Sequence, residues 1–97
     1  MIVVEKKKDK ISILGHALYE DYGKDIVCSA VSSIVITTIN GILIINKDAI
    51  KVNTNKGIEI DLLKSDKVTL SLIENMMLLL KDLEKQYPKN IKIKEGV

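Results

Sequence analysis

The sequence has 97 residues, a formal net charge of +2, and fifteen basic residues that are all lysine. This length allows one domain, residues 1–97, and excludes a second hydrophobic core. The chain has no arginine, and its only aromatic residues of the Phe, Trp and Tyr type are three tyrosines, so it has few groups that read base edges or stack on bases. This composition excludes specific nucleic-acid recognition. Weak attraction to an anionic surface remains open.

The first elements in chain order are two short β-type runs, Ile2–Lys7 and Lys10–Leu14, which predict an opening hairpin. The stretch from Gly15 to Lys24 interrupts the pattern. It has glycine near both ends, at Gly15 and Gly23, and predicts a loop with glycine hinges.

The apolar stretch Ile26–Ile45 supports two interpretations. Asp25 resembles a helix N-cap, and a helical spacing links Ile26, Ala30, Ser33, Ile34 and Thr37. The pair Asn40-Gly41 between β-branched runs instead predicts a hairpin of Ile34–Ile39 and Ile42–Ile45. Local rules do not decide between them. A membrane span is disfavoured, because serine, threonine and asparagine interrupt the stretch.

The remaining chain predicts a second hairpin, a helix and a strand. Ala49–Thr54 and Gly57–Leu62 flank a turn, and Ser65 or Asp66 is expected to cap a helix that continues to about Gln86. Polar positions of this helix share one face, and the opposite face is expected to contain Met76, Leu79, Leu80 and Leu83. Pro88 ends the helix, and Ile91–Lys94 alternates like an edge strand.

The only histidine, His16, and the only cysteine, Cys28, are the candidate catalytic groups. If Asp25 caps the helix, Cys28 occupies the third helical position, where free N–H groups and the helix dipole favour a thiolate. His16 would take the thiol proton and later protonate the leaving amine. The backbone N–H groups of Cys28 and Ser29 would hold the oxyanion, Asp25 would orient His16, and Ser32 would hydrogen-bond within the site.

Each of these residues also has a structural interpretation. A lone cysteine on an apolar helix is commonly inert core, Asp25 is a plain cap, and Ser32 is a small packing residue. One histidine and one cysteine are too few for a zinc site, so no metal and no cofactor are expected. A single cysteine and the lack of a visible signal peptide point to the reducing cytoplasm.

The two elements Gly15-His16-Ala17 and Gly23-Lys24-Asp25-Ile26-Val27-Cys28-Ser29-Ala30-Val31-Ser32 together resemble the signature of the ribosomal-processing cysteine protease family, called Prp or YsxB-like. The usual alanine after the cysteine is here Ser29. Length and element order agree over essentially the whole chain, and the resemblance favours the helix over the hairpin for residues 26–45.

The resemblance implies Cys28 as nucleophile and His16 as its base, with supporting roles for Asp25 and Ser32. It also implies a mobile loop, Ala17–Lys24, that orders over bound peptide, so that Gly15, Ala17, Tyr19, Tyr22 and Gly23 are candidate substrate-loop residues. The implied substrate is the short N-terminal extension of one large-subunit ribosomal protein, the twenty-seventh of the L series, cut after an aromatic pair.

The family resemblance further implies a homodimer, and the apolar run Met76, Met77, Leu78, Leu79 and Leu80 is compatible with one. The expected fold is α+β, a two-layer, mainly antiparallel sheet with two helices in the order β-β-α-β-β-α-β. The expected function is a cofactor-free cytoplasmic cysteine endopeptidase. The alternative is a non-catalytic module that docks on the ribosome through its lysines.

Overall fold

The computed structural model describes residues 1–15 and 22–96, with side chains for 1–15 and 26–96. Five strands and two helices follow the predicted order. Their bounds are β1 Ile2–Lys6, β2 Lys10–Leu14, α1 Tyr22–Ile45, β3 Ile50–Asn53, β4 Ile58–Leu62, α2 Lys67–Gln86 and β5 Ile91–Glu95. The predicted α+β class and both predicted hairpins are confirmed.

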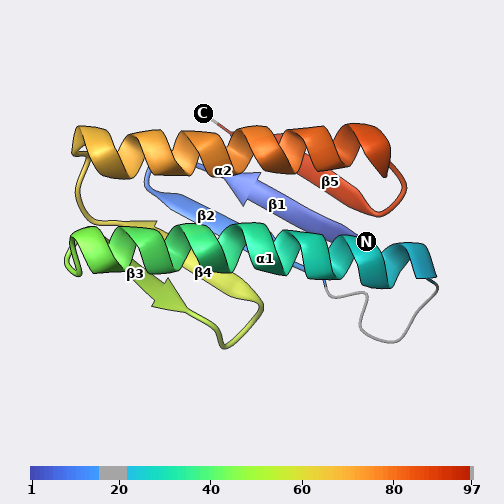
Figure 1. The fold of residues 1–97 in the computed structure, drawn as a ribbon, viewed down its shortest axis with the longest axis horizontal. Helices are drawn as coiled ribbons and strands as arrows, with labels where there is room; N and C mark the ends of the chain where they lie inside the picture. The colour runs from blue at the N-terminus through green and yellow to red at the C-terminus, as the bar shows by residue number, and fades with distance from the viewer. Residues whose placement is uncertain (16–21, 97) are drawn as a thin grey trace.

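The five strands form one sheet in the order β3-β4-β2-β1-β5. Three neighbouring pairs are antiparallel, and β1 pairs with β5 in parallel. Both helices lie on the same face of the sheet and run in opposite directions, so the molecule has two layers (Figure 1). The strand that was expected at an edge, β5, is an edge strand.

The strand register gives the sheet two distinct ends. At one end lie Ile2, Leu14, Ile58 and Ile91, which we call the cysteine end because Cys28 packs there. At the other end lie Lys6, Lys10, Leu62 and Glu95, which we call the lysine end. A five-residue strand spans about 17 Å, so the strands separate the two ends by roughly that distance.

The core is aliphatic, as the composition requires, and lies between the helices and the sheet. Its largest fully buried side chains are Ile11, Ile42, Ile60, Met76, Leu80 and Ile91. The opposite face of the sheet bears polar residues, among which the Lys10 ammonium contacts the Glu59 and Asp61 carboxylates at 3.2 and 3.9 Å. One buried face and one polar face explain the alternation along each strand.

Helix α1 resolves the choice between helix and hairpin for residues 26–45. Its buried face consists of Val27, Val31, Val35, Ile39 and Ile42, spaced three or four residues apart. Burial of this stripe against the sheet outweighs the local turn preference of Asn40-Gly41. The helix prediction is confirmed. The residues whose spacing suggested the helix are not its buried stripe, however, because Ile26, Ser33 and Thr37 are exposed.

The outer face of α1 mixes serine, threonine and asparagine with exposed isoleucines. Residues Ile26–Ile45 have a mean hydropathy of 2.0 and are long enough to cross a bilayer, a property that core helices of water-soluble proteins share. Five side chains of this segment belong to the core. The core-helix interpretation therefore holds for one face of the helix, and the other face is exposed to solvent.

Helix α2 begins as predicted, with Asp66 as its N-cap. The Thr69 backbone N–H donates to Asp66 Oδ2 at 3.1 Å, and the Thr69 hydroxyl donates to Oδ1 at 2.9 Å. These hydrogen bonds stabilise the ionised carboxylate and lower the pKa of Asp66. Met76 and Leu80 are buried, but Leu79 is 43% exposed, so its assignment to the buried face was wrong.

The edge strand β5 has two of its backbone donors occupied by nearby groups. The Ile93 N–H donates to Glu84 Oε2 on α2 at 2.9 Å, and the Ile91 N–H donates to the Tyr87 carbonyl at 3.2 Å. Both bonds also fix the position of α2 relative to the sheet.

Candidate active site

Cys28 lies on α1 at the cysteine end of the sheet and is partly buried against the core. It lines a small cavity of about 20 Å³ with side chains from four different elements. The cavity is lined by Ile2, Ile13, Leu14, Gly15, Cys28, Val31, Ser32 and Ile58. A space of this size holds at most about one water molecule, so the thiol faces a nearly closed apolar niche.

Ser32 lines the same cavity as Cys28 because residues four apart lie one above the other on a helix. The structure therefore brings together the predicted nucleophile and one of its two predicted supporting residues. The neighbouring serines are different, because Ser29 and Ser33 are exposed to solvent.

The start of α1 corrects the expected environment of the thiol. The helix begins at Tyr22, so Asp25 belongs to its first turn and is not the N-cap, and Tyr22, Gly23 and Lys24 are helical rather than part of the loop. Cys28 is consequently the seventh helical residue instead of the third. Because the helix dipole acts mainly within the first turn, its effect on Cys28 is weaker than predicted.

The sequence contains the reason for this error. Asp21 immediately precedes Tyr22, and aspartate favours an N-cap at either Asp21 or Asp25 equally well. Gly23 suggested a loop, but glycine costs a helix only about 1 kcal/mol. The spacing of the motif therefore could not fix the first residue of α1.

The later start also bears on the predicted oxyanion donors, the backbone N–H groups of Cys28 and Ser29. Only the first four N–H groups of a helix lack a helical acceptor, and in α1 these belong to residues 22–25. The assignment of Cys28 and Ser29 as oxyanion donors stays a prediction.

Gly15 directly follows β2 and directly precedes His16. It has a φ of +84°, and a Cβ atom added there would lie 2.2 Å from the Met1 carbonyl oxygen. Only glycine fits this backbone. The backbone conformation at Gly15, the last described residue before His16, is therefore restricted by its close approach to the Met1 carbonyl.

Several predicted site residues lie outside the described residues. These are His16, Ala17 and Tyr19, together with the side chains of Tyr22 and Asp25, whereas the backbone of Gly23 is described as part of α1. The described part of the chain contains no cluster of three or more residues able to ligate a metal ion.

The walls of the Cys28 cavity were not foreseen. Ile2, Ile13 and Ile58 come from three strands, and no spacing within the sequence relates them to Cys28. Gly57 also supports this end of the sheet, with a φ of +77° and a virtual Cβ 2.4 Å from the Ile13 carbonyl oxygen. The turn Asn55-Lys56-Gly57 was predicted, but its contact with β2 depends on strand order.

Comparisons with known proteins agree with this geometry. The profile of the family described as Cysteine protease Prp matches residues 1–92. The structure is similar to the S. aureus ribosomal processing protease Prp in complex with a covalently linked product peptide, with a TM-score of 0.87, 24% identity and 99% and 100% of the two chains covered.

Two other solved structures are also similar. The same S. aureus protease in complex with a substrate peptide gives a TM-score of 0.89 at 22% identity, covering 99% of this chain and 100% of that one. A Streptococcus mutans protein gives 0.81 at 25% identity, covering 97% and 90%. A search of curated proteins found no match. Because the family profile spans nearly the whole sequence, the chain belongs to the Prp family of cysteine proteases.

Proposed function

We propose that this protein is a cysteine endopeptidase that removes the short N-terminal extension of a large-subunit ribosomal protein, the twenty-seventh of the L series, with Cys28 as nucleophile and His16 as general base and acid. The observation that supports this most directly is the position of Cys28. Its thiol shares a cavity with Gly15, the residue before His16, in a chain whose family consists of cysteine proteases.

The chemistry requires two steps. His16 accepts the Cys28 proton, and the thiolate attacks the scissile carbonyl carbon to form a tetrahedral intermediate. The C–N bond then breaks, the leaving amine takes the proton from His16, and an acyl thioester remains. Water, deprotonated by His16, hydrolyses the thioester and releases the free thiol. With Cys28 in the second turn of α1, His16 has the larger part in activating it.

Ser32 and Asp25 are the proposed supporting residues. Ser32 lies in the cavity of the thiol and can hydrogen-bond a polar group there, and Asp25 lies one turn before Cys28 in α1. For the N–H groups of Cys28 and Ser29 to stabilise the oxyanion, the first turn of α1 must unwind as peptide binds. The proposed substrate loop, with Gly15, Ala17, Tyr19, Tyr22 and Gly23, directly precedes or includes that turn.

The substrate assignment rests on the relatives, because the S. aureus protease was crystallised with a substrate peptide and with a product peptide. The apolar cavity at Cys28 suits an apolar side chain, but at about 20 Å³ it must widen to accept an aromatic ring. We also propose that the protein is cytoplasmic and homodimeric. Of the apolar run offered for a dimer surface, only Leu78 and Leu79 are exposed.

The test is cleavage of a synthetic peptide spanning the extension, followed by mass spectrometry. The wild-type protein should cut at one site, and Cys28→Ala and His16→Ala should each reduce the rate by about four orders of magnitude or more, because loss of either member of a catalytic dyad removes the covalent pathway. Cleavage by Cys28→Ala would refute the proposal.

Alkylation by iodoacetamide separates a catalytic thiol from an inert one. Cys28 should react rapidly in the folded protein near neutral pH, and His16→Ala should slow this reaction. Ser33→Ala, an exposed change on the same helix, is the matched control and should react like wild type. A thiol that reacts only after unfolding would instead support the ribosome-docking module.

A further inference from the structure

A second cavity lies at the lysine end of the sheet, away from Cys28. It has a volume of about 340 Å³ and is formed between α2 and the ends of β1, β4 and β5. Pockets of roughly 300 Å³ and more, with apolar walls and a few polar groups, are typical of small-molecule sites. Nothing in the proposed protease chemistry uses this cavity.

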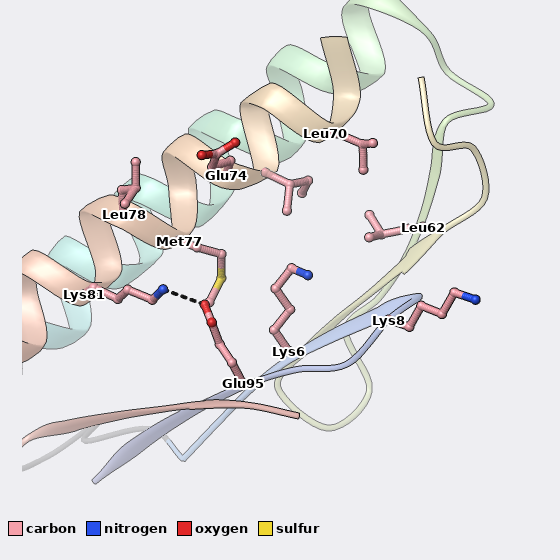
Figure 2. A pocket seen from close by; sticks show the side chains of 10 residues that line it. Lys6, Lys8, Leu62, Leu70, Glu74, Met77, Leu78, Lys81 and Glu95 are labelled. Atoms are coloured by element: carbon pink, nitrogen blue, oxygen red, sulfur yellow. Dashed lines mark ion pairs between the residues drawn. The ribbon is translucent and has the colours of Figure 1, made fainter. Parts of the chain in front are cut away.

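The walls of the cavity are aliphatic. They consist of Leu62, Leu70, Ile73, Met77 and Leu78, and the Met77 thioether points into the space (Figure 2). Leu70 and Leu78 at its rim are 43% and 54% exposed, which is unfavourable without a covering group. Among the described side chains, no aromatic one lines the cavity, so these walls offer no stacking surface for a base or a sugar ring.

The charged side chains around the cavity are not balanced. The Lys81 ammonium contacts Glu95 Oε1 at 2.7 Å across one side and neutralises it. Lys6 and Lys8 line the strand side, and among the described side chains no carboxylate forms an ion pair with either. Glu74 is the remaining charge, and its carboxylate is directed away from Lys6 and Lys8 (Figure 2).

The cavity also continues toward the start of α2. A second hollow of about 140 Å³ shares Lys8, Leu62 and Leu70 with it and extends to Leu63 and Lys64. The second hollow is also lined by Asp9 and Ser65, so the two hollows together form an elongated groove with leucine side chains along it and a border that carries both lysines and carboxylates. An extended aliphatic chain fits such a groove better than a compact ring.

We propose that the cavity at the lysine end binds an anionic amphiphile, a free aliphatic chain of medium length that ends in a carboxylate. The chain would cover Leu70, Ile73, Met77 and Leu78. The carboxylate would pair with Lys6, whose ammonium is directed into the cavity, and with Lys8 after its side chain, which points away from the cavity in Figure 2, turns toward it. The lack of aromatic walls excludes a nucleotide as the fitting ligand, and the two unpaired ammonium groups favour an acid over a neutral lipid.

The test uses decanoate below its micelle concentration, followed by NMR of the ¹³C-labelled methionine methyl groups. The Met77 side chain lines the cavity, whereas the Met76 side chain is buried elsewhere in the core. Met1 lies next to Gly15, at the cysteine end of the sheet. Saturable shifts are expected at Met77, with much smaller ones at Met76 and Met1. Equal shifts at all three would indicate detergent-like binding and overturn the proposal.

The carboxylate is tested with matched ligands and variants. Decan-1-ol should bind at least about fivefold more weakly than decanoate, and Lys6→Gln or Lys8→Gln should weaken decanoate binding by about five- to tenfold, because each removes a charge-assisted hydrogen bond. Lys51→Gln, an exposed lysine on β3, is the control and should not change the affinity.

Leu78→Glu provides an independent variant. Leu78 is largely exposed, so the fold should persist, while the new carboxylate at the rim should repel decanoate and abolish the Met77 shift. If decan-1-ol binds as tightly as decanoate and the lysine variants bind like wild type, the groove recognises only apolar surface and the proposed anion specificity is refuted. Peptide cleavage by Lys6→Gln and Lys8→Gln should equal wild type, so failure here is distinguishable from failure of the protease proposal.

Discussion

The two ends of the sheet differ in size and in chemistry. At the cysteine end, a cavity of about 20 Å³ surrounds the one thiol, and its walls are closely packed isoleucine, leucine and valine. At the lysine end, a cavity of about 340 Å³ is open and bordered by charge. The proposed nucleophile thus lies at the smaller of the two cavities, and cavity size alone would have selected the other end as the candidate site.

The difference has a mechanical cause. The cysteine end is fixed by backbone contacts, since Gly15 and Gly57 have positive φ values and each lies close to a carbonyl group. The lysine end also has backbone hydrogen bonds, such as the one from the Gly96 N–H to the Lys6 carbonyl oxygen at 2.8 Å, but there α2 contacts β5 through the exposed Lys81–Glu95 ion pair, which solvent can screen. Backbone contacts position a catalytic group within narrow limits, whereas exposed side chains adapt to ligands of variable length.

Among the variants that compare the two ends, the largest effect on the free energy of unfolding is expected for Gly15→Ala at the cysteine end. A residue with a Cβ atom is disfavoured at a φ of +84° by about 1–2 kcal/mol, and here the atom would also collide with the Met1 carbonyl. The free energy of unfolding should fall by about 2 kcal/mol or more, and peptide cleavage should fall with it. Thermal unfolding and the cleavage assay measure both effects.

Gly41→Ala is the matched control for that change. Among the described atoms outside its own helix backbone and chain neighbours, none lies within 4 Å of a Cβ added at Gly41, which lies in α1 near its C-terminal end. Alanine should stabilise the helix by about 0.5–1 kcal/mol and leave cleavage unchanged. A stable Gly15→Ala protein with full activity would show that the cysteine end tolerates backbone displacement.

A smaller effect is expected for Ser32→Ala, compared with Ser33→Ala on the same helix. Ser32 shares the cavity of Cys28, so loss of one hydrogen bond worth about 1 kcal/mol should lower kcat/KM about fivefold. Ser33 is exposed, and its replacement should be neutral. The two variants are compared by their rates of peptide cleavage. Equal rates would show that Ser32 has no supporting role in the proposed site.

The smallest effect is expected for Asp66→Ala, near the lysine end. Hydrogen bonds from the Thr69 N–H and hydroxyl lower the pKa of Asp66, so its contribution to stability is present above the ordinary pKa of a carboxyl group. That contribution is lost as the pH falls through the lowered pKa of the folded state. The variant should melt below wild type at pH 7, and the difference should shrink in strong acid.

Cleavage by Asp66→Ala at pH 7 should match wild type, because the cap lies at the opposite end of the sheet from Cys28. A difference in melting temperature that stays constant from pH 7 into strong acid would show that the loss comes from packing of Thr69 rather than from the ionised carboxylate. Thermal unfolding across pH measures this directly.

Local patterns predicted the elements well because most are formed by neighbouring residues. The hairpin Ile2–Leu14 and the Asp66 cap follow from contacts within a few residues, and the strand Ile91–Glu95 follows from its own alternation, although it pairs with the distant β1. The buried face of α1 could not be predicted from local contacts, because apolar residues occur on nearly every side of the helix. The stripe of Val27, Val31 and Val35 is distinguished from its neighbours only by packing against the sheet.

The candidate site was partly predictable for the same reason. Cys28 and Ser32 are four residues apart on one helix, so their proximity follows from helical geometry. The lysine-end cavity combines Lys6, Leu62, Leu78 and Glu95 from four elements, and only the strand order brings these together. No motif could have indicated it.

The hydrogen bond from the Ile93 N–H to Glu84 also limits how the sheet can grow. With Ile93 and Ile91 already bonded within the chain, β5 is a poor template for a further strand, whereas β3 at the opposite edge keeps its outward backbone groups. Two copies joined through β3 would each present a blunted β5 edge to the outside. Polymerisation by strand addition would therefore stop at a pair, because the Glu84 carboxylate and the Tyr87 carbonyl occupy two donors of the β5 edge.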